Sequence, residues 1–218
     1  MKKIISFAFL FGVIINSFGQ IEPKHTFTME VGMPIATANP FFKGVMKSIV
    51  NLSPYYQFRF KNSFTLGAGA NYSYLQVDKF KVPTAEPAKG GVHTIGGFVK
   101  VGHEKFHNEQ FATDFGVKIG YNKTYFNTDF NDSIYGKAQT VNSVSVTPML
   151  GLILSVDEFS SYRFTIGYAF NGFGFSPQRL GIQTNAGYNV SEYSKPTQCL
   201  IIGFGFTHYF SKVKNTEE

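Results

Sequence analysis

The sequence of 218 residues contains no tryptophan and a single cysteine, Cys199. A lone cysteine excludes an intramolecular disulfide, so no disulfide framework holds this chain together. Charged residues are scarce, at 16%, and the net charge of +6 falls to +4 (6 − 2) without Lys2 and Lys3. This modest excess reflects scattered lysines and gives no case for nucleic-acid binding. Beyond the first residues the sequence also lacks a long apolar run, and a transmembrane helix needs about 20 apolar residues.

The amino terminus has the three parts of a secretory signal peptide. Lys2 and Lys3 precede an almost entirely apolar run over 4–15, and a small residue, Gly19, stands before the polar Gln20. The apolar run is too short for a transmembrane anchor, and no cysteine follows it that would take a lipid. We therefore expect a signal peptide over residues 1–19, cleaved after Gly19.

The sequence is rich in Phe (25 residues), Tyr (12) and Gly (22), and its mean hydropathy is close to zero. The apolar residues alternate with small or polar ones in eight segments, which predicts β-strands because successive side chains on a strand point to opposite faces. In the last segment, CLIIGFGFTHYF, Leu200 to Phe210 in steps of two form one large face. The expected strands are 25–33, 50–60, 64–74, 92–102, 111–121, 143–155, 162–170 and 199–210.

The connections between these segments alternate in length. Short ones are 61–63, 103–110 and 156–161, and long ones are 34–49, 75–91, 122–142 and 171–198. Short periplasmic turns and long extracellular loops are typical of transmembrane barrels. The pattern predicts an all-β, eight-stranded, antiparallel up-and-down transmembrane β-barrel over residues 20–210, with a periplasmic tail at 211–218.

The size of the apolar side chains indicates which face points outward. An eight-stranded barrel is just wide enough to be filled by side chains, so this many Phe and Tyr residues would overfill it. The opposite face is rich in Gly, Ser and Thr, which suit a narrow lumen. The apolar face is therefore expected to contact lipid. A secreted β-sandwich with the apolar face inside has room for these residues and stays open as the alternative.

The chain resembles the small outer-membrane β-barrel family of Gram-negative bacteria. The likeness rests on the segments FTMEVGMP, FKNSFTLGAGANYSYL and LIIGFGFTHYF, together with the signal peptide. It implies a location in the outer membrane, contact with membrane lipid and lipopolysaccharide, and insertion by the barrel assembly machinery. The tail over 211–218 departs from the family, whose members usually end at or near the last aromatic residue.

Six charged residues fall on the inward faces: Glu30, Arg59, Lys100, Asp114, Lys118 and Arg163. Lone charges in a narrow lumen are costly, so pairing is expected. Glu30 with Arg59 and Lys100 with Asp114 lie on neighbouring strands. We interpret the set as a structural ionic network that fixes the strand register and blocks permeation. A proton or ion path is the alternative.

The histidines offer two weaker hypotheses. His103, Glu104 and His107 in the segment HEKFH would suit a metal if that turn were helical, but such residues in a short turn are usually just polar. We therefore expect no metal and no other cofactor. His93, with Ser73 or Ser143 as nucleophile, would suit a lipid-modifying enzyme, but nothing in the sequence brings them together.

The long connections carry the remaining features. The segment 39–48 is aromatic and basic, and it predicts either a short helix on lipid headgroups or a loop folded over the barrel mouth. The connection 171–198 mixes Gly, Asn and aromatic residues, which suits recognition of an unknown extracellular partner but also describes an ordinary loop. Cys199 is expected to point inward, without a role.

Together these features favour a non-enzymatic outer-membrane barrel, either structural or an interaction platform that works through its extracellular loops. The alternatives are a lipid-modifying enzyme and a narrow channel or secretion accessory.

Overall fold

A computed structural model describes residues 20–21, 24–78, 81–82, 89–182, 187, 189–211 and 214–215. The expected signal peptide over 1–19 lies outside the described residues and stays a prediction. Of the expected tail, Ser211 and the pair Lys214–Asn215 are described. Lys214–Asn215 forms β10, which pairs antiparallel with β1, Gln20–Ile21.

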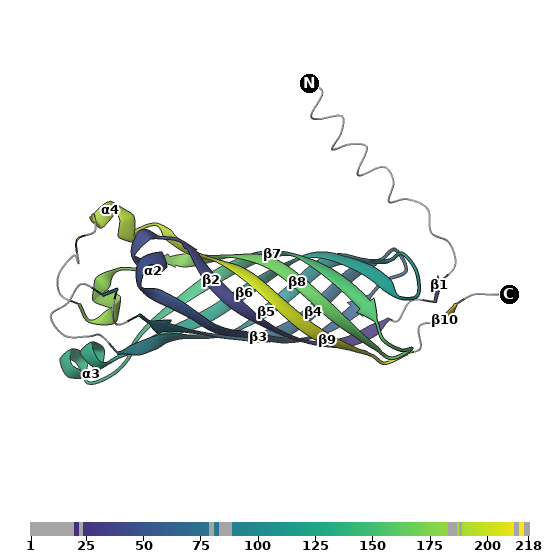
Figure 1. The fold of residues 1–218 in the computed structure, drawn as a ribbon, viewed down its shortest axis with the longest axis horizontal. Coiled ribbons are helices and arrows are strands. Elements are labelled where there is room, and N and C mark those ends of the chain that lie inside the picture. Colours follow the sequence, from purple (N-terminus) through teal and green to yellow (C-terminus); the bar gives the residue numbers. More distant parts are fainter. Residues whose placement is uncertain are drawn as a thin grey trace, which may run out of the picture.

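Eight antiparallel strands close into a barrel in their order along the chain, as predicted (Figure 1). The ring closes where the first of these strands, β2, pairs with the last, β9. The strands are β2 (His25–Ala38), β3 (Met46–Arg59), β4 (Phe64–Val77), β5 (Gly90–Phe106), β6 (Phe111–Thr128), β7 (Gln139–Ser155), β8 (Ser160–Gly174) and β9 (Pro196–Tyr209).

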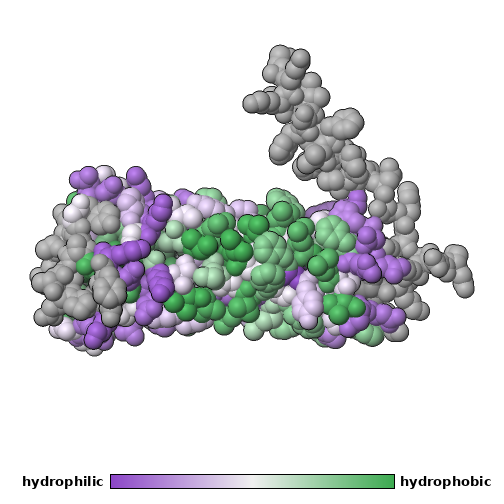
Figure 2. Space-filling model, viewed as in Figure 1, coloured by the Kyte–Doolittle hydropathy of each residue, from purple (hydrophilic) through white to green (hydrophobic). Residues whose placement is uncertain are grey.

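The middle of the barrel exposes its apolar side chains and buries its polar ones. Phe115 and Phe204 are 62% and 68% exposed, whereas Thr28, Lys100 and Asp114 are fully buried. Exposed apolar side chains occur on all eight strands of the barrel, and we call them the apolar belt. Figure 2 shows in green the part of the belt that lies on one face. The predicted orientation is therefore confirmed. The β-sandwich alternative is wrong, because all eight strands belong to one closed sheet whose apolar face points outward.

Most strands extend further than predicted at the end that carries the long connections, here called the loop end. β6 continues from the expected Tyr121 to Thr128, and β4 continues from Tyr74 to Val77. In these extensions the polarity of the alternation reverses: Leu75 and Phe126 point inward and are buried. The sequence prediction stopped at this reversal, because it followed an outward apolar face that ends where the belt ends.

Short helices cover the loop end (Figure 1). They are α2 (Pro40–Val45), α3 (Asp129–Tyr135), the 3₁₀ helix η1 (Pro177–Leu180) and α4 (Val190–Tyr193). Among the described residues, no helix is long and apolar enough to cross a membrane. At the opposite end, the turn end, the connections are short and cover 60–63, 107–110 and 156–159.

The loop end has an apolar core of its own, which we call the cap core. It packs α2, η1 and α4 against the inward faces of the strand extensions. Its buried residues include Phe41, Phe42, Val45, Leu75, Val92, Phe126, Phe175, Leu180 and Tyr193. The hypothesis that segment 39–48 lies on lipid headgroups is thus wrong, because Phe41 and Phe42 pack on Phe175 over the barrel mouth.

Candidate functional site: the lumen

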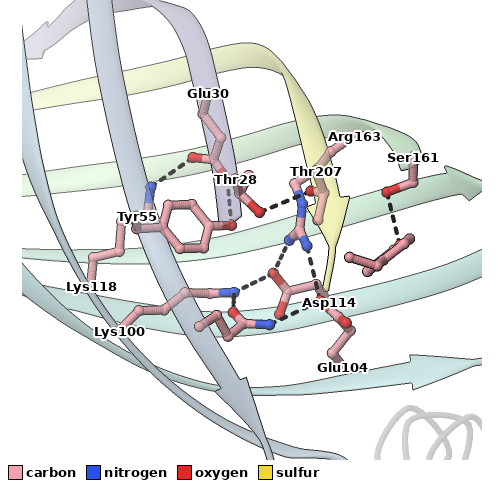
Figure 3. A network of polar contacts seen from close by, with 12 residues as sticks. Thr28, Glu30, Tyr55, Lys100, Glu104, Asp114, Lys118, Ser161, Arg163 and Thr207 are labelled. Carbon is pink, nitrogen blue, oxygen red and sulfur yellow. Dashed lines mark hydrogen bonds and ion pairs between the residues drawn. The ribbon is translucent and has the colours of Figure 1, made fainter. Parts of the chain in front are cut away.

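The charged side chains of the lumen form one group of two hydrogen-bonded clusters, which meet where the Lys100 ammonium lies 5.1 Å from the ring centroid of Tyr55 (Figure 3). Strands β2, β3, β5, β6 and β8 all contribute to it, because each places a polar residue on its inward face. We call this group the lumen network. Its members are Glu30, Tyr55, Gln57, Lys100, Glu104, Asp114, Lys118 and Arg163.

Asp114 lies at the centre of the network and accepts from two cations. Lys100 Nζ donates to its Oδ2 at 2.6 Å, and Arg163 Nη1 donates to the same oxygen. Arg163 also donates through Nη2 to Glu104 Oε2 at 2.9 Å. These four side chains are at most 1% exposed, so the strands hold them without help from bulk water.

Gln57 joins the two halves of this cluster. Its amide oxygen accepts from Lys100 Nζ at 2.5 Å, and its amide nitrogen donates to Glu104 Oε2 at 3.1 Å. A neutral amide can do both at once because it carries a donor and an acceptor side by side.

Glu30 and Lys118 form a second pair nearer the loop end. Lys118 Nζ donates to Glu30 Oε2 at 2.6 Å, and Tyr55 OH donates to Oε1 at 3.0 Å. The ammonium of Lys118 also lies 5.0 Å from the ring centroid of Tyr55 and 4.8 Å from that of Phe98. Aromatic rings thus cover the cation where no carboxylate does.

The lumen network is electrically balanced. Three carboxylates, Glu30, Glu104 and Asp114, face three cations, Lys100, Lys118 and Arg163. Buried charges survive only when paired and hydrogen-bonded, and removing one partner of a buried pair typically costs about 3–5 kcal/mol. The network therefore depends on every member being present.

Five of the six charged residues expected in the lumen belong to this network. The expected pair of Lys100 with Asp114 is confirmed, but the expected pair of Glu30 with Arg59 is wrong. Glu30 lies opposite Ser53 on β3, six residues before Arg59, which is about 20 Å along a strand. Glu30 pairs instead with Lys118. Arg59 lies near the turn end, where it donates to Ser63 and its guanidinium lies 4.8 Å from the Phe106 ring centroid.

Sequence reasoning missed three members of the network: Glu104, Gln57 and Tyr55. Glu104 was assigned to a turn because the expected strand ended at 102, whereas β5 continues to Phe106. Its even spacing from Lys100 was the available signal, since residues four apart on a strand share a face. Gln57 and Tyr55 lie on the inward face of their strand but carry no charge, so they were not singled out.

An apolar layer closes the lumen below the network, at the turn end. Phe106, Ala112, Ile153 and Tyr209 pack together there and are at most 2% exposed. Tyr209 OH donates to Ser161 Oγ at 2.8 Å, which satisfies its hydroxyl within the layer.

A cavity of about 90 Å³ lies above the network, between Glu30 and Lys118 below and Phe42 above. Most of its polar lining is uncharged and comes from all around the barrel: Asn51, Asn71, Asn122, Asn171, Ser53, Ser73, Ser145, Thr94, Thr147 and Thr165. Cys199 also lines it, which confirms its expected inward direction. A polar cavity of this size has room for several water molecules. We call it the chamber.

The metal site at HEKFH and the histidine–serine site are both wrong, because the side chains that would form each site point to opposite faces of the barrel wall. His103 is exposed on the outer face of β5, whereas Glu104 points into the lumen. No group of three potential metal ligands occurs in the described part of the chain. His93 lies on the outer face with Tyr72 and Tyr74, its Nδ1 3.0 Å from Tyr72 OH. Ser73 and Ser143 point inward, so no histidine–serine pair forms there.

Comparisons with known proteins add the fold class. Neither the family models nor the curated proteins match this sequence. Among solved structures, Neisserial surface protein A is similar at 12% identity and a TM-score of 0.52, over 85% of this chain and 97% of that one. The outer membrane protein OprG from Pseudomonas aeruginosa is similar at 12% identity and a TM-score of 0.50, over 86% of this chain and 97% of that one. Ail of Yersinia pestis is similar at 10% identity and a TM-score of 0.49, over 86% of this chain and 99% of that one.

The chain therefore has the fold of the small, eight-stranded outer-membrane β-barrels. A closed barrel with an apolar belt outside and paired charges inside is the arrangement that a bilayer requires, because no strand edge is left unpaired in lipid. This fold and its apolar belt support a location in the outer membrane. Because the long loops of such barrels are extracellular and their short turns periplasmic, we take the loop end as extracellular and the turn end as periplasmic.

Proposed function

We propose that the protein is a non-enzymatic, non-conducting barrel that presents a rigid extracellular cap for interaction with a partner. The observation that carries the proposal is the lumen network, whose central side chains are at most 1% exposed and bridge β3, β5, β6 and β8. An ion passing through would have to break several buried pairs at once. The apolar layer at Phe106 and Tyr209 supports the same conclusion.

The cap is held together by asparagine side chains, which supports a role as a platform. Asn39, just before α2, donates from Nδ2 to the carbonyls of Tyr193 (3.3 Å) and Lys195 (2.9 Å). Asn131, in α3, donates to the carbonyls of Phe126 and Arg179, both at 2.9 Å. The fourth extracellular connection is therefore fastened to the first by Asn39 and to the third by Asn131.

The outer surface of the cap exposes a few apolar side chains, beyond the reach of the apolar belt. Ile134 and Tyr135 end α3, and Val190 begins α4. Rigid loops with exposed aromatic and aliphatic groups suit recognition, because little conformational entropy is lost on binding.

Planar-bilayer recordings of purified protein test the closed lumen. We expect no stable open events for the wild type. A variant with Lys100, Glu104, Asp114 and Arg163 all changed to Ala loses equal numbers of each charge. Combined with Phe106→Ala and Tyr209→Ala in the apolar layer and with Phe42→Ala in the cap core, it should conduct. Lys43→Ala on the exposed face of α2 is the control, and heat-modifiable gel migration checks that each barrel is closed. Stable openings of the wild type would refute the proposal.

Two further measurements test the absence of lipid-modifying activity and the binding of a partner by the cap. The mass spectrum of lipid A should be the same with and without expression, and a mass shift lost in His93→Ala would instead indicate an enzyme. A photo-crosslinking residue at Tyr135 should give adducts on intact cells, whereas one at Asp157 in a periplasmic turn should not give the same adducts. Identical adducts from both positions would argue against a cap-specific partner.

A further inference from the structure

The segment HEKFH presents a basic face to the outside of the barrel. It forms the periplasmic end of β5 and the first residue of the next turn. Glu104 and Phe106 are buried in the lumen, so His103 and Lys105 point the other way. His107 is exposed, and its Nε2 lies 2.9 Å from Oγ1 of Thr113, which lies opposite Lys105 on β6. The three basic residues therefore share the outer face of the barrel.

The outer face of β5 shows where this segment lies relative to the bilayer. Between His93 and His103 it carries Ile95, Gly97, Val99 and Val101, with no polar side chain. Ten residues at about 3.4 Å each, tilted by about 40°, span about 26 Å, which matches the height of the apolar band of such barrels. His93 thus marks the extracellular edge of the apolar belt, and residues 103–107 lie at its periplasmic edge.

Aromatic residues flank the basic face, as expected at a membrane interface. His103 lies opposite Phe64 on β4 and Phe115 on β6, and both rings are exposed. The ring of His107 stacks on Phe111 at 5.5 Å between centroids. These rings offer an apolar contact for the glycerol and upper acyl region of a lipid, and the stacking fixes the direction of His107.

The positive charge of Lys105 has no protein partner in the described part of the chain. Two nearby carboxylates, Glu104 and Asp114, pair with Arg163 inside the lumen. The exposed Glu109 in the adjacent turn forms no ion pair with Lys105, His103 or His107. The turn between β3 and β4 carries a further lysine, Lys61. A hydrogen bond from Glu104 N to Ser63 O at 2.9 Å holds this turn beside β5.

We propose that Lys105 binds the phosphate of a glycerophospholipid in the inner leaflet of the outer membrane, with His103 and His107 on either side of it along the same face. The site lies at headgroup height, carries uncompensated positive charge and has apolar rings on its membrane side. A metal does not fit the same residues. His103 and His107 are separated by about 13 Å of extended chain, too far apart to bind one ion together.

Native mass spectrometry of the full chain in detergent tests the site, with phosphatidylglycerol as the probe and diacylglycerol as the phosphate-free comparison. Lys105→Gln should weaken binding of phosphatidylglycerol about fivefold, which corresponds to about 1 kcal/mol for one lysine at a membrane surface. The triple variant with His103, Lys105 and His107 changed to Gln should weaken it further. Lys43→Gln, the same change on the extracellular cap, should have no effect.

Three outcomes would overturn the proposal. Diacylglycerol bound as well as phosphatidylglycerol would show contact with the apolar belt only. Equal binding by the triple variant, with its barrel closed by gel migration, would place the lipid elsewhere. Zn²⁺ bound by the wild type, lost in the triple variant and displacing the lipid would show a metal site. Recordings of conductance are unaffected by these outcomes, so this test is independent of the closed lumen.

Discussion

Arg163 on β8 and Asp114 on β6 form an ion pair that passes over the strand between them, β7, at Gly151. A Cβ at Gly151 would lie 3.4 Å from Arg163 Nη1 and 3.4 Å from Asp114 Cβ. Glycine therefore clears the path for the central contact of the lumen network.

A side chain larger than Ala at Gly151 should separate Arg163 from Asp114. Gly151→Ala adds a methyl group at ordinary contact distance and should be tolerated. Gly151→Val requires side chains to shift and should destabilise the barrel by about 1–3 kcal/mol. Urea unfolding in detergent, followed by gel migration, measures the difference. Equal stability of the two variants would show that the contact over β7 adapts freely.

The pair of Glu30 and Lys118 should show strong energetic coupling. Glu30→Gln or Lys118→Met alone leaves a buried charge without its partner and should cost about 3–5 kcal/mol, while the double variant should cost clearly less than the sum. The same unfolding assay measures the cycle. The control is the corresponding cycle with Glu30→Gln and Arg59→Met, because Glu30 does not pair with Arg59. Additive effects of Glu30→Gln and Lys118→Met would mean that water in the chamber already solvates the two groups.

Loss of the Asn39 side chain should loosen the cap. Asn39→Ala removes the hydrogen bonds to the carbonyls of Tyr193 and Lys195 and the N-cap of α2, while Asn142→Ala on the outer face of β7 is the control. We expect faster proteolysis within the extracellular connections.

Cys199 provides a second readout of the same variant. The thiol lines the chamber beneath the cap core and is 5% exposed. It should react with a maleimide slowly in the folded wild type, faster in Asn39→Ala and fastest after denaturation. A wild-type thiol that reacts as fast as the denatured one would mean that the cap leaves the chamber open.

The β7–β8 turn should contribute to stability in a pH-dependent way. The amide of Phe159 donates to Asp157 at 2.7 Å and the hydroxyl of Ser160 at 3.1 Å, and these contacts lower the pKa of the Asp157 carboxyl. Because the folded-state pKa is the lower one, the contribution is complete above the unfolded-state pKa and is lost as the pH falls through the folded-state value.

Asp157→Asn removes this titration, so the variant should lose less stability than the wild type from about pH 4 downward. Gel-migration midpoints against pH measure this, with Glu109→Gln, an exposed acid in the neighbouring turn, as control. A wild-type and a variant curve that run parallel through the acid range would contradict the prediction.

The strands of the apolar belt could be predicted from the sequence because their signal is local. Residues such as Phe204 and Phe206 alternate with Gly203 and Gly205, and this period of two already implies two faces. The lengths of the connections then gave the up-and-down order. The volume of the side chains gave the outward direction. Each of these inferences needs only neighbouring residues or a count.

The strand extensions and the cap were harder to predict because their signal changes sign. In the stretch 122–128 the apolar residue, Phe126, points inward, whereas Tyr121 and Ile119 point to lipid. A single rule for the whole strand fails at that boundary. The side-chain hydrogen bonds of Asn39 and Asn131 join connections that are more than 40 residues apart, and no spacing in the sequence indicates such partners.

The sequence by itself determined that this chain forms eight strands with an apolar side toward lipid and a small or ionic side within, because alternation and volume are properties of the strands themselves. Only the tertiary structure decided which charges meet across strands that are not neighbours. Glu30 and Lys118 are 88 residues apart and lie on strands that do not pair, so their contact depends on how the closed barrel sets the height of every strand across the lumen.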